Sequence, residues 1–145
     1  MDTKLHFLVV NDSPQIRHII VSLLKELGYI KVSEANDGQM ALRSIKTARV
    51  FGAPINFVIT DFAMPVMNGI DLARAMRGNP DMREIPILMI TAEATPEHIL
   101  AAVEVGVDSY LVRPFKATSL KKKVDALLVN RGLKKPDIEF GSLRR

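Results

Sequence analysis

Five short apolar segments alternate with five segments of helical periodicity, and this alternation constrains the fold more than any other feature of the sequence. The apolar segments span 5–10, 30–33, 55–60, 85–90 and 109–112. Most are continuous runs of Val, Ile, Leu and Met, which are typical of strands buried on both faces of a parallel sheet. Strict alternation of strand and helix predicts a doubly wound α/β fold, and five strands favour the flavodoxin-like order 2-1-3-4-5.

The helical segments carry recognisable start and stop signals. Ser13 is a suitable N-cap for a first helix that has Pro14 in its first turn and ends at Gly28. Four further helices are expected over 39–47, 68–77, 95–106 and around 120–128. The alternation implies right-handed crossover connections between the strands.

Length and composition exclude several classes of protein. The chain of 145 residues is expected to form one domain. It has no cysteine, which excludes a disulfide framework, a zinc–thiolate site and a thiol nucleophile. The apolar runs are too short to span a bilayer, and the run at 5–10 ends in Asn11 and Asp12 rather than in a signal-peptide cleavage site. We therefore expect a cytoplasmic protein.

The net charge of +4 is unevenly distributed along the chain. Residues 1–112 contain 10 Lys and Arg against 13 Asp and Glu, whereas residues 113–145 contain 10 against 3. A basic end raises nucleic acid or an acidic partner as a possibility, but no DNA- or RNA-reading motif accompanies it. We interpret it as a solvated helix face plus a basic tail or linker at 132–145, following a domain at 1–131.

Polar side chains stand at the ends of four expected strands. Asn11 and Asp12 follow the first strand, Asp61 follows the third, Thr91 ends the fourth and Arg113 follows the fifth. In open parallel sheets, ligands bind beyond the carboxyl ends of the strands, where the strand order reverses. The order 2-1-3-4-5 makes the first and third strands neighbours, so we expect Asp12 and Asp61 to face each other.

This set of side chains indicates phosphoryl chemistry. Two facing carboxylates beside a loop carbonyl form a hard oxygen site suited to Mg²⁺. A hydroxyl from Thr91 and the cation of Arg113 would hold an anionic group such as a phosphoryl group on Asp61. The chain lacks GxGxxG, GxxxxGK[ST] and Ser-nucleophile motifs, and its three histidines lie on separate elements. Dinucleotide binding, P-loop hydrolysis and histidine catalysis are therefore disfavoured.

The same residues lie in stretches that resemble the response-regulator receiver family, and closely its stand-alone chemotaxis members. The stretches are FLVVND at 7–12, LLKELGY at 23–29, EANDGQMAL at 34–42, VITDFAMPVMNG at 58–69, ILMITAEA at 87–94 and SYLVRPF at 109–115. They cover most of residues 5–130 in the family's order. The resemblance implies a monomeric signalling switch in a two-component system, which assists its own phosphoryl transfer and is not an enzyme acting on a separate substrate.

The resemblance also implies roles for individual residues. Asp61 would be the phosphoacceptor, charged by a histidine kinase or a small phosphodonor. Asp12, Asp61 and the backbone carbonyl of Ala63 would ligate Mg²⁺. Thr91 would bind a phosphoryl oxygen, and Tyr110 would change rotamer with it. The switch would act on a downstream target, such as a motor or effector, through the surface formed by the fourth helix, fifth strand and fifth helix.

Two residues depart from the family's pattern. Asn11 stands where the family usually has a second acid; its carbonyl oxygen could still act through a bridging water, and a loss of about 10–100-fold in metal affinity is expected. Arg113 stands where the family nearly always has Lys, and its planar guanidinium is bulkier. The resemblance also implies that the peptide bond from Arg113 to Pro114 is cis. The alternative hypothesis is a degenerate receiver, with Arg113 paired to Asp61, that binds proteins independently of phosphorylation.

Overall fold

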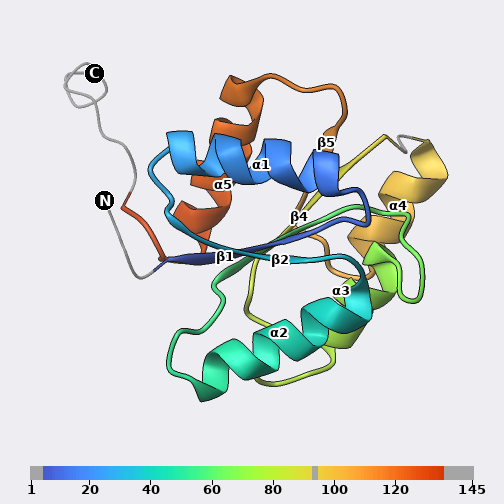
Figure 1. The fold of residues 1–145 in the computed structure, drawn as a ribbon. Coiled ribbons are helices and arrows are strands. Elements are labelled where there is room, and N and C mark those ends of the chain that lie inside the picture. Colours follow the sequence, from blue (N-terminus) through green and yellow to red (C-terminus); the bar gives the residue numbers. More distant parts are fainter. Residues whose placement is uncertain (1–4, 93–94, 136–145) are drawn as a thin grey trace.

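The computed structural model describes residues 5–92 and 95–135, in which five strands alternate with five helices (Figure 1). The strands are β1 (His6–Val10), β2 (Lys31–Ala35), β3 (Phe57–Thr60), β4 (Ile87–Thr91) and β5 (Ser109–Val112). The helices are α1 (Pro14–Glu26), α2 (Gly38–Val50), α3 (Gly69–Arg77), α4 (Pro96–Glu104) and α5 (Ala117–Asn130). The alternation of strand and helix expected from the apolar pattern is confirmed.

The strands form one parallel sheet in the order β2-β1-β3-β4-β5, which confirms the predicted topology. β1 pairs with β2 on one side and with β3 on the other, so the strand order reverses beside β1. Because all five strands run in one direction, their carboxyl ends lie at the same edge of the sheet. This edge carries the loops that follow β1, β3, β4 and β5.

Successive residues of the central strands face two separate hydrophobic cores. In β1, Phe7 and Val9 pack with α1 and α5, whereas Leu8 and Val10 pack with α2, α3 and α4. Figure 1 shows α1 and α5 on one side of the sheet and α2 and α3 on the other. Burial on both faces explains why these strands read as continuous apolar runs rather than as alternating patterns.

Several elements differ from their expected bounds: β3 and β4 begin at 57 and 87 rather than at 55 and 85, and α5 begins at 117 rather than near 120. β2 occupies Lys31–Ala35 rather than 30–33, and only Ala35 in it is buried. An edge strand is hydrogen-bonded on one side only, and most of its side chains are not buried. β2 therefore lacks the continuous apolar run that marks the central strands, which made its bounds harder to infer. α2 extends to Val50 rather than 47, since its last turn is largely exposed and has few apolar residues to mark it.

Four of the five helices begin at a side-chain cap. Ser13, Asp37, Asn68 and Thr95 each accept a hydrogen bond from the backbone N–H three residues later, whereas α5 has no such cap. Each cap satisfies a backbone donor that the first turn leaves unpaired. The cis peptide bond before Pro114 is confirmed. Among the described residues, none of the helices has the length and apolar character needed to cross a membrane.

The chain keeps contact with the domain beyond the end of α5. Leu133 packs against the core on the α1 and α5 side, and Lys134 Nζ lies 2.9 Å from Asp125 Oδ1 on α5. A domain boundary at 131 stays a prediction. Most of the expected tail, residues 136–145, lies outside the described residues.

Candidate functional site

The strand-end residues singled out in the sequence meet at the carboxyl edge of the sheet. Asn11 follows β1 and is 2% exposed, Asp61 follows β3 and is 6% exposed, and Thr91 ends β4 at 1% exposure. Arg113 follows β5, and its backbone N–H donates to the Thr91 carbonyl at 2.9 Å. Four neighbouring strands therefore each deliver one polar side chain to this edge.

Asp61 is a buried carboxylate with three hydrogen-bond donors. Its Oδ2 accepts from Asn11 Nδ2 and from the Arg113 guanidinium, both at 3.2 Å. Its Oδ1 accepts from the backbone N–H of Phe62 at 2.6 Å. A carboxylate removed from water needs such donors, because its charge is otherwise costly to bury.

Asn11 presents its amide nitrogen, not its oxygen, to Asp61. The Asn11 Oδ1 atom accepts the backbone N–H of Ser13 at 2.9 Å, at the start of α1. A side-chain amide has one oxygen and one nitrogen, so a carbonyl engaged by Ser13 leaves the NH₂ group to face the carboxylate. Asn11 thus joins the beginning of α1 to Asp61.

Asp12 differs from Asn11 in its surroundings. The Asp12 residue is exposed, and no hydrogen bond or ion pair joins it to Asp61 within the described residues. Those residues also contain no group of three His, Cys, Asp or Glu side chains that could hold a metal ion. One reason is chemical, because Asn11, the residue that contacts Asp61 from the end of β1, is neutral. The expected facing of Asp12 and Asp61 stays a prediction.

Arg17 takes part in the site although the sequence did not single it out. Its Nη1 atom donates to the Asn11 carbonyl at 2.7 Å, and its Nε atom donates to Glu34 at 3.0 Å. The side chain is only 18% exposed. Arg17 therefore ties the β1–α1 turn to the end of β2, a contact that depends on the strand order and has no local sequence signal.

The loop after Asp61 packs tightly against the strand end. Gly69 N donates to the Phe62 carbonyl at 2.9 Å, which closes the loop. A Cβ atom added at Gly69 would lie 2.0 Å from the Asp61 carbonyl oxygen, a distance that no side chain can occupy. Val66 within this loop has φ 67°, the left-handed region that β-branched residues rarely adopt.

One hydrogen-bond donor of the Arg113 guanidinium is unused among the described residues. While one terminal nitrogen of its guanidinium contacts Asp61, its Nε atom is buried without a hydrogen-bond partner among the described residues. An additional oxygen acceptor at this position would satisfy that donor. Tyr110, on the same strand, lies opposite Met89 of β4 and is half-buried against the core on the α2, α3 and α4 side.

A ring contact joins the loop after Asp61 to α4. The Phe62 and His98 rings are edge-to-face with centroids 4.5 Å apart. His98 Nδ1 also lies 2.7 Å from the Thr95 hydroxyl at the N-cap of α4. The residue next to Asp61 is thus in direct contact with the first turn of α4.

Comparisons with known proteins agree with this fold and site. The family model of the response regulator receiver domain matches residues 7–125. Chemotaxis protein CheY-3 of Vibrio cholerae is 39% identical over 127 residues, covering 88% of this chain and 94% of that protein. Chemotaxis protein CheY of Pseudomonas aeruginosa is 40% identical over 120 residues, covering 83% and 93%.

Solved structures give the same result. Vibrio cholerae chemotaxis protein CheY4 matches with a TM-score of 0.76 and 35% identity, covering 86% of this chain and 98% of that chain. The receiver domain of a signal transduction histidine kinase from Syntrophus aciditrophicus matches with a TM-score of 0.76 and 29% identity, covering 93% and 97%. By its sequence match, its sheet order and its strand-end residues, the chain belongs to the response regulator receiver domain family.

Proposed function

We propose that this two-component receiver accepts a phosphoryl group on Asp61 and changes its affinity for a protein partner in response. The supporting observation is the buried Asp61 carboxylate, surrounded by donors from Asn11, Arg113 and the Phe62 backbone. The phosphodonor would be a histidine kinase or a small acyl phosphate. The CheY-type relatives favour the same function, since the match covers 94% and 93% of their lengths.

In the proposed step, an oxygen of Asp61 attacks the phosphorus of the donor. The bond between that phosphorus and the donor's leaving atom breaks, and an aspartyl phosphate forms. The Arg113 guanidinium already donates to the carboxylate and has a buried Nε donor to spare, so it is placed to balance the added negative charge. Thr91 is proposed to donate its hydroxyl to a phosphoryl oxygen.

The oxygen donors at this edge fit Mg²⁺, but their total negative charge is reduced because Asn11 is neutral. Asp12 and Asp61 supply carboxylates, and the Ala63 carbonyl accepts no hydrogen bond from the described residues and is therefore available. Asn11 faces Asp61 through its nitrogen and contributes no anionic oxygen. Oxygen ligands of this kind suit a hard cation. When bound, Mg²⁺ would supply positive charge against the transferring phosphoryl group.

The proposed output surface consists of α4, β5 and α5. Apolar side chains on α4 and β5 are exposed: Ile99 39%, Leu100 58%, Val103 63% and Val112 39%. Exposed apolar groups that lie together mark protein-binding surfaces, and three of these four lie within five residues of α4. The contact between Phe62 and His98 gives a physical route from the loop after Asp61 to this surface, and Tyr110 is the proposed switch side chain on β5.

The proposal is tested by intact mass after incubation with acetyl phosphate, with and without Mg²⁺. We expect a Mg²⁺-dependent gain of one phosphoryl group that Asp61→Asn abolishes. Asp71→Asn is a matched control, because Asp71 is an exposed residue on α3 and the change is chemically identical. An adduct retained in Asp61→Asn would contradict the assignment of the acceptor.

A second candidate function follows from the ion pair between Arg113 and Asp61. Asn11 and Arg113 already compensate the carboxylate without a metal ion, so one conformation could be held permanently. The protein would then be a binding module that works without phosphorylation. Absence of an adduct in the folded protein, together with partner binding that Asp61→Asn leaves unchanged, would favour this function over the first.

A further inference from the structure

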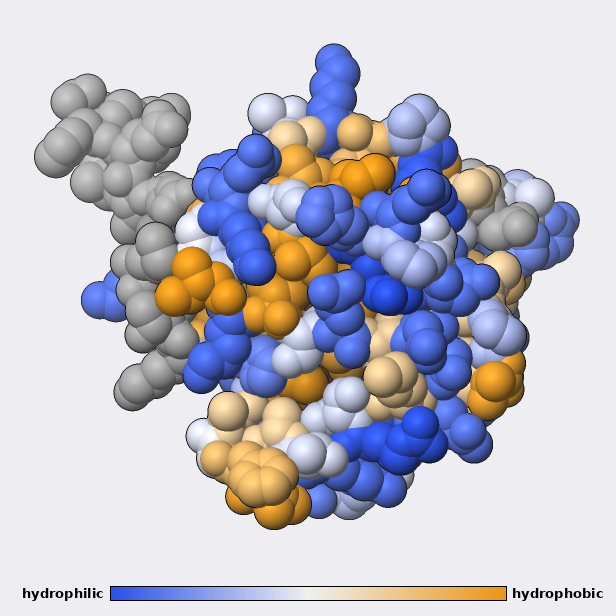
Figure 2. All heavy atoms as spheres, in the orientation of Figure 1, coloured by the Kyte–Doolittle hydropathy of each residue, from blue (hydrophilic) through white to orange (hydrophobic). Residues whose placement is uncertain are grey.

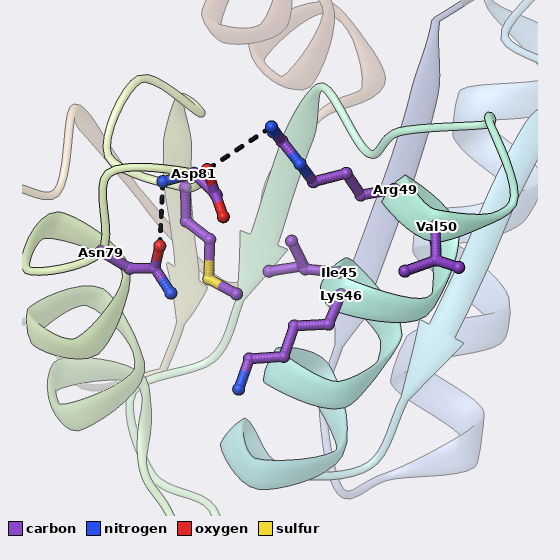
Figure 3. Close-up of a pocket in the computed structure, with 7 residues that line it drawn as sticks. Ile45, Lys46, Arg49, Val50, Asn79 and Asp81 are labelled. Atoms are coloured by element: carbon purple, nitrogen blue, oxygen red, sulfur yellow. Dashed lines mark hydrogen bonds and ion pairs between the residues drawn. The ribbon is translucent and has the colours of Figure 1, made fainter.

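A groove lies between α2 and the loop that connects α3 to β4, here called the α2 groove (Figure 3). Its volume is about 440 Å³. It is lined by Ile45, Lys46, Arg49, Val50, Asn79, Asp81 and Met82. In Figure 3 the α2 side chains approach from one side, and Asn79 and Asp81 from the other.

The α2 groove combines an apolar floor with a charged rim. Ile45 and Met82 are 3% and 2% exposed and belong to the core on this side of the sheet. Val50 and Phe51, at the end of α2, are 80% and 81% exposed. Figure 2 shows a hydrophobic cluster over this end of α2, at the lower left of the molecule. Apolar surface therefore continues from the floor of the groove to its outer lip.

The rim is positively charged on the α2 side. Lys46 and Arg49 of α2 line the groove and are exposed, and α2 contains no acidic residue. Only Arg49 forms an ion pair among the described residues; its guanidinium is 3.4 Å from Asp81, with both side chains about 60% exposed. Exposed pairs of this kind contribute little, so the cations are available to another carboxylate.

The α2 groove lies away from the phosphoryl site. α2 ends before β3 begins, and the α3–β4 loop ends where β4 begins, so both border the amino edge of the sheet. Asp61 lies at the opposite, carboxyl edge. The groove is also separate from α4, β5 and α5, the elements of the proposed output surface. An occupant here would compete with neither the phosphodonor nor the output partner.

We propose that residues 136–140 of the chain bind the α2 groove. These residues lie outside the described part of the chain, and their sequence is Pro-Asp-Ile-Glu-Phe. Carboxylates at 137 and 139 alternate with Ile138 and Phe140. In an extended segment, alternate side chains point to opposite sides. Ile138 and Phe140 would then face the apolar floor, and the two carboxylates, on the side away from the floor, would pair with the long exposed side chains of Lys46 and Arg49 at the rim.

The end of the described chain lies close enough for this contact. Leu133 lines a small cavity together with Glu84 and Ile85 of the α3–β4 loop. Asp81, on the rim of the α2 groove, is three residues before Glu84 in the same loop. The five residues 136–140 span up to about 17 Å when extended. The segment can therefore follow the α3–β4 loop from Leu133 to the groove.

The experiment compares amide NMR spectra of the full chain and of a chain that ends at Lys135. We expect the amide chemical shifts of residues 45–51 and 79–82 to differ between the two chains. If the tail is bound in about two thirds of the molecules, amide hydrogen exchange in these segments should be about threefold faster without it. A synthetic peptide of residues 136–142, added to the shortened chain, should reproduce the shifts. Differences confined to the residues next to 135 would overturn the proposal.

Charge reversal tests the rim contacts. In chains that carry Lys46→Glu with Arg49→Glu, removing residues 136–145 should no longer change the spectrum of residues 79–82, and adding Asp137→Lys with Glu139→Lys to the full chain should restore the difference. The matched control is Lys25→Glu with Lys31→Glu, two exposed cations on α1 and β2, in which removing the tail should still change the spectrum of residues 79–82. If the shifts weaken on tenfold dilution, the occupant is the tail of a second copy, which overturns binding within one molecule.

Discussion

At the scale of single residues, Asn11 determines how the Asp61 carboxylate is compensated. Replacing it by Asp removes the Nδ2 donor at 3.2 Å and adds a carboxylate beside Asp61. We expect Mg²⁺ to bind about 10–100-fold more tightly, because the ligand set gains an anionic oxygen. Without metal, the free energy of unfolding should fall by about 1–3 kcal/mol, because two buried carboxylates repel each other.

Titration calorimetry with Mg²⁺ and urea unfolding with and without Mg²⁺ measure the two effects of Asn11→Asp. Asn130→Asp is the control, since Asn130 is exposed at the end of α5. An unchanged Mg²⁺ affinity in Asn11→Asp would place the metal ligands elsewhere than at the ends of β1 and β3.

The backbone conformation of Val66 lowers the stability of the folded protein. Its φ of 67° is unfavourable for a β-branched residue, while its side chain is 76% exposed and contributes little packing. Asn adopts this conformation more easily, so we expect Val66→Asn to raise the free energy of unfolding by about 1 kcal/mol. The melting temperature should rise by about 3 °C, as measured by circular dichroism. Val103→Asn, at an exposed helical position, should give no such rise.

At the scale of elements, the loop between β3 and α3 depends on Gly69. A Cβ atom there would meet the Asp61 carbonyl at 2.0 Å, and the backbone of β3 cannot yield without moving the acceptor. We expect Gly69→Ala to cost about 3 kcal/mol in urea unfolding. Gly78→Ala is the control, because its Cβ would have no atom closer than 3.5 Å and its φ is −82°. Equal stability of the two variants would contradict this packing.

The contact between α5 and the residues that follow it should make the free energy of unfolding depend on pH. Burial alone would raise the pKa of Asp125, but hydrogen bonds from Lys121 and Lys134, together with their charges, lower it below its ordinary value. A carboxyl whose pKa is lower in the folded state stabilises the fold at pH values above its unfolded-state pKa of about 3.9. It loses this stabilising contribution as the pH falls through its folded-state pKa. The stability difference between wild type and Asp125→Asn should therefore shrink below about pH 4, as measured by urea unfolding.

The presence and order of the strands were predictable from sequence, and their bounds less so. The central strands β1, β3 and β4 have apolar runs because helices cover both faces of the sheet. β2 was misplaced by one residue at its start and two at its end, and β3 and β4 each begin two residues later than expected, because apolar residues also precede the paired segment. The cap residue Ser13 was predictable because capping is local. The amide orientation of Asn11 and the contacts of Arg17 depend on where distant strands meet, so no local pattern encodes them.

At the scale of the whole molecule, Asp108 joins elements that are far apart in the chain. Its carboxylate accepts from Arg77 of α3 at 2.7 Å, from the Ile87 backbone of β4 at 2.8 Å and from Arg131 after α5 at 2.7 Å. Burial lowers the pKa of Arg77, while the charge of Asp108 opposes that effect. The network fixes the amino edge of the sheet across both of its faces.

Removing this carboxylate should destabilise the protein as a whole. We expect Asp108→Ala to lower the free energy of unfolding by about 2–3 kcal/mol, because Arg77 would keep a half-buried charge without its partner. Asp81→Ala, which breaks the exposed pair with Arg49, should cost less than about 0.5 kcal/mol. Urea unfolding of both variants provides the measurement. Equal losses of unfolding free energy would show that the Asp108 network contributes no more to stability than the exposed pair.

The order β2-β1-β3-β4-β5 also has a consequence for the growing polypeptide. Every strand after the first pairs with a strand already synthesised: β2 and β3 with β1, β4 with β3, and β5 with β4. The sheet can therefore extend in the order of translation. Its Phe7 and Phe57 face, however, lacks Leu120 and Val124 until α5, the last helix, has been made. A chain that ends before residue 117 would have all five strands but one apolar face of the sheet partly uncovered, and exposed apolar surface of this kind binds chaperones and promotes aggregation.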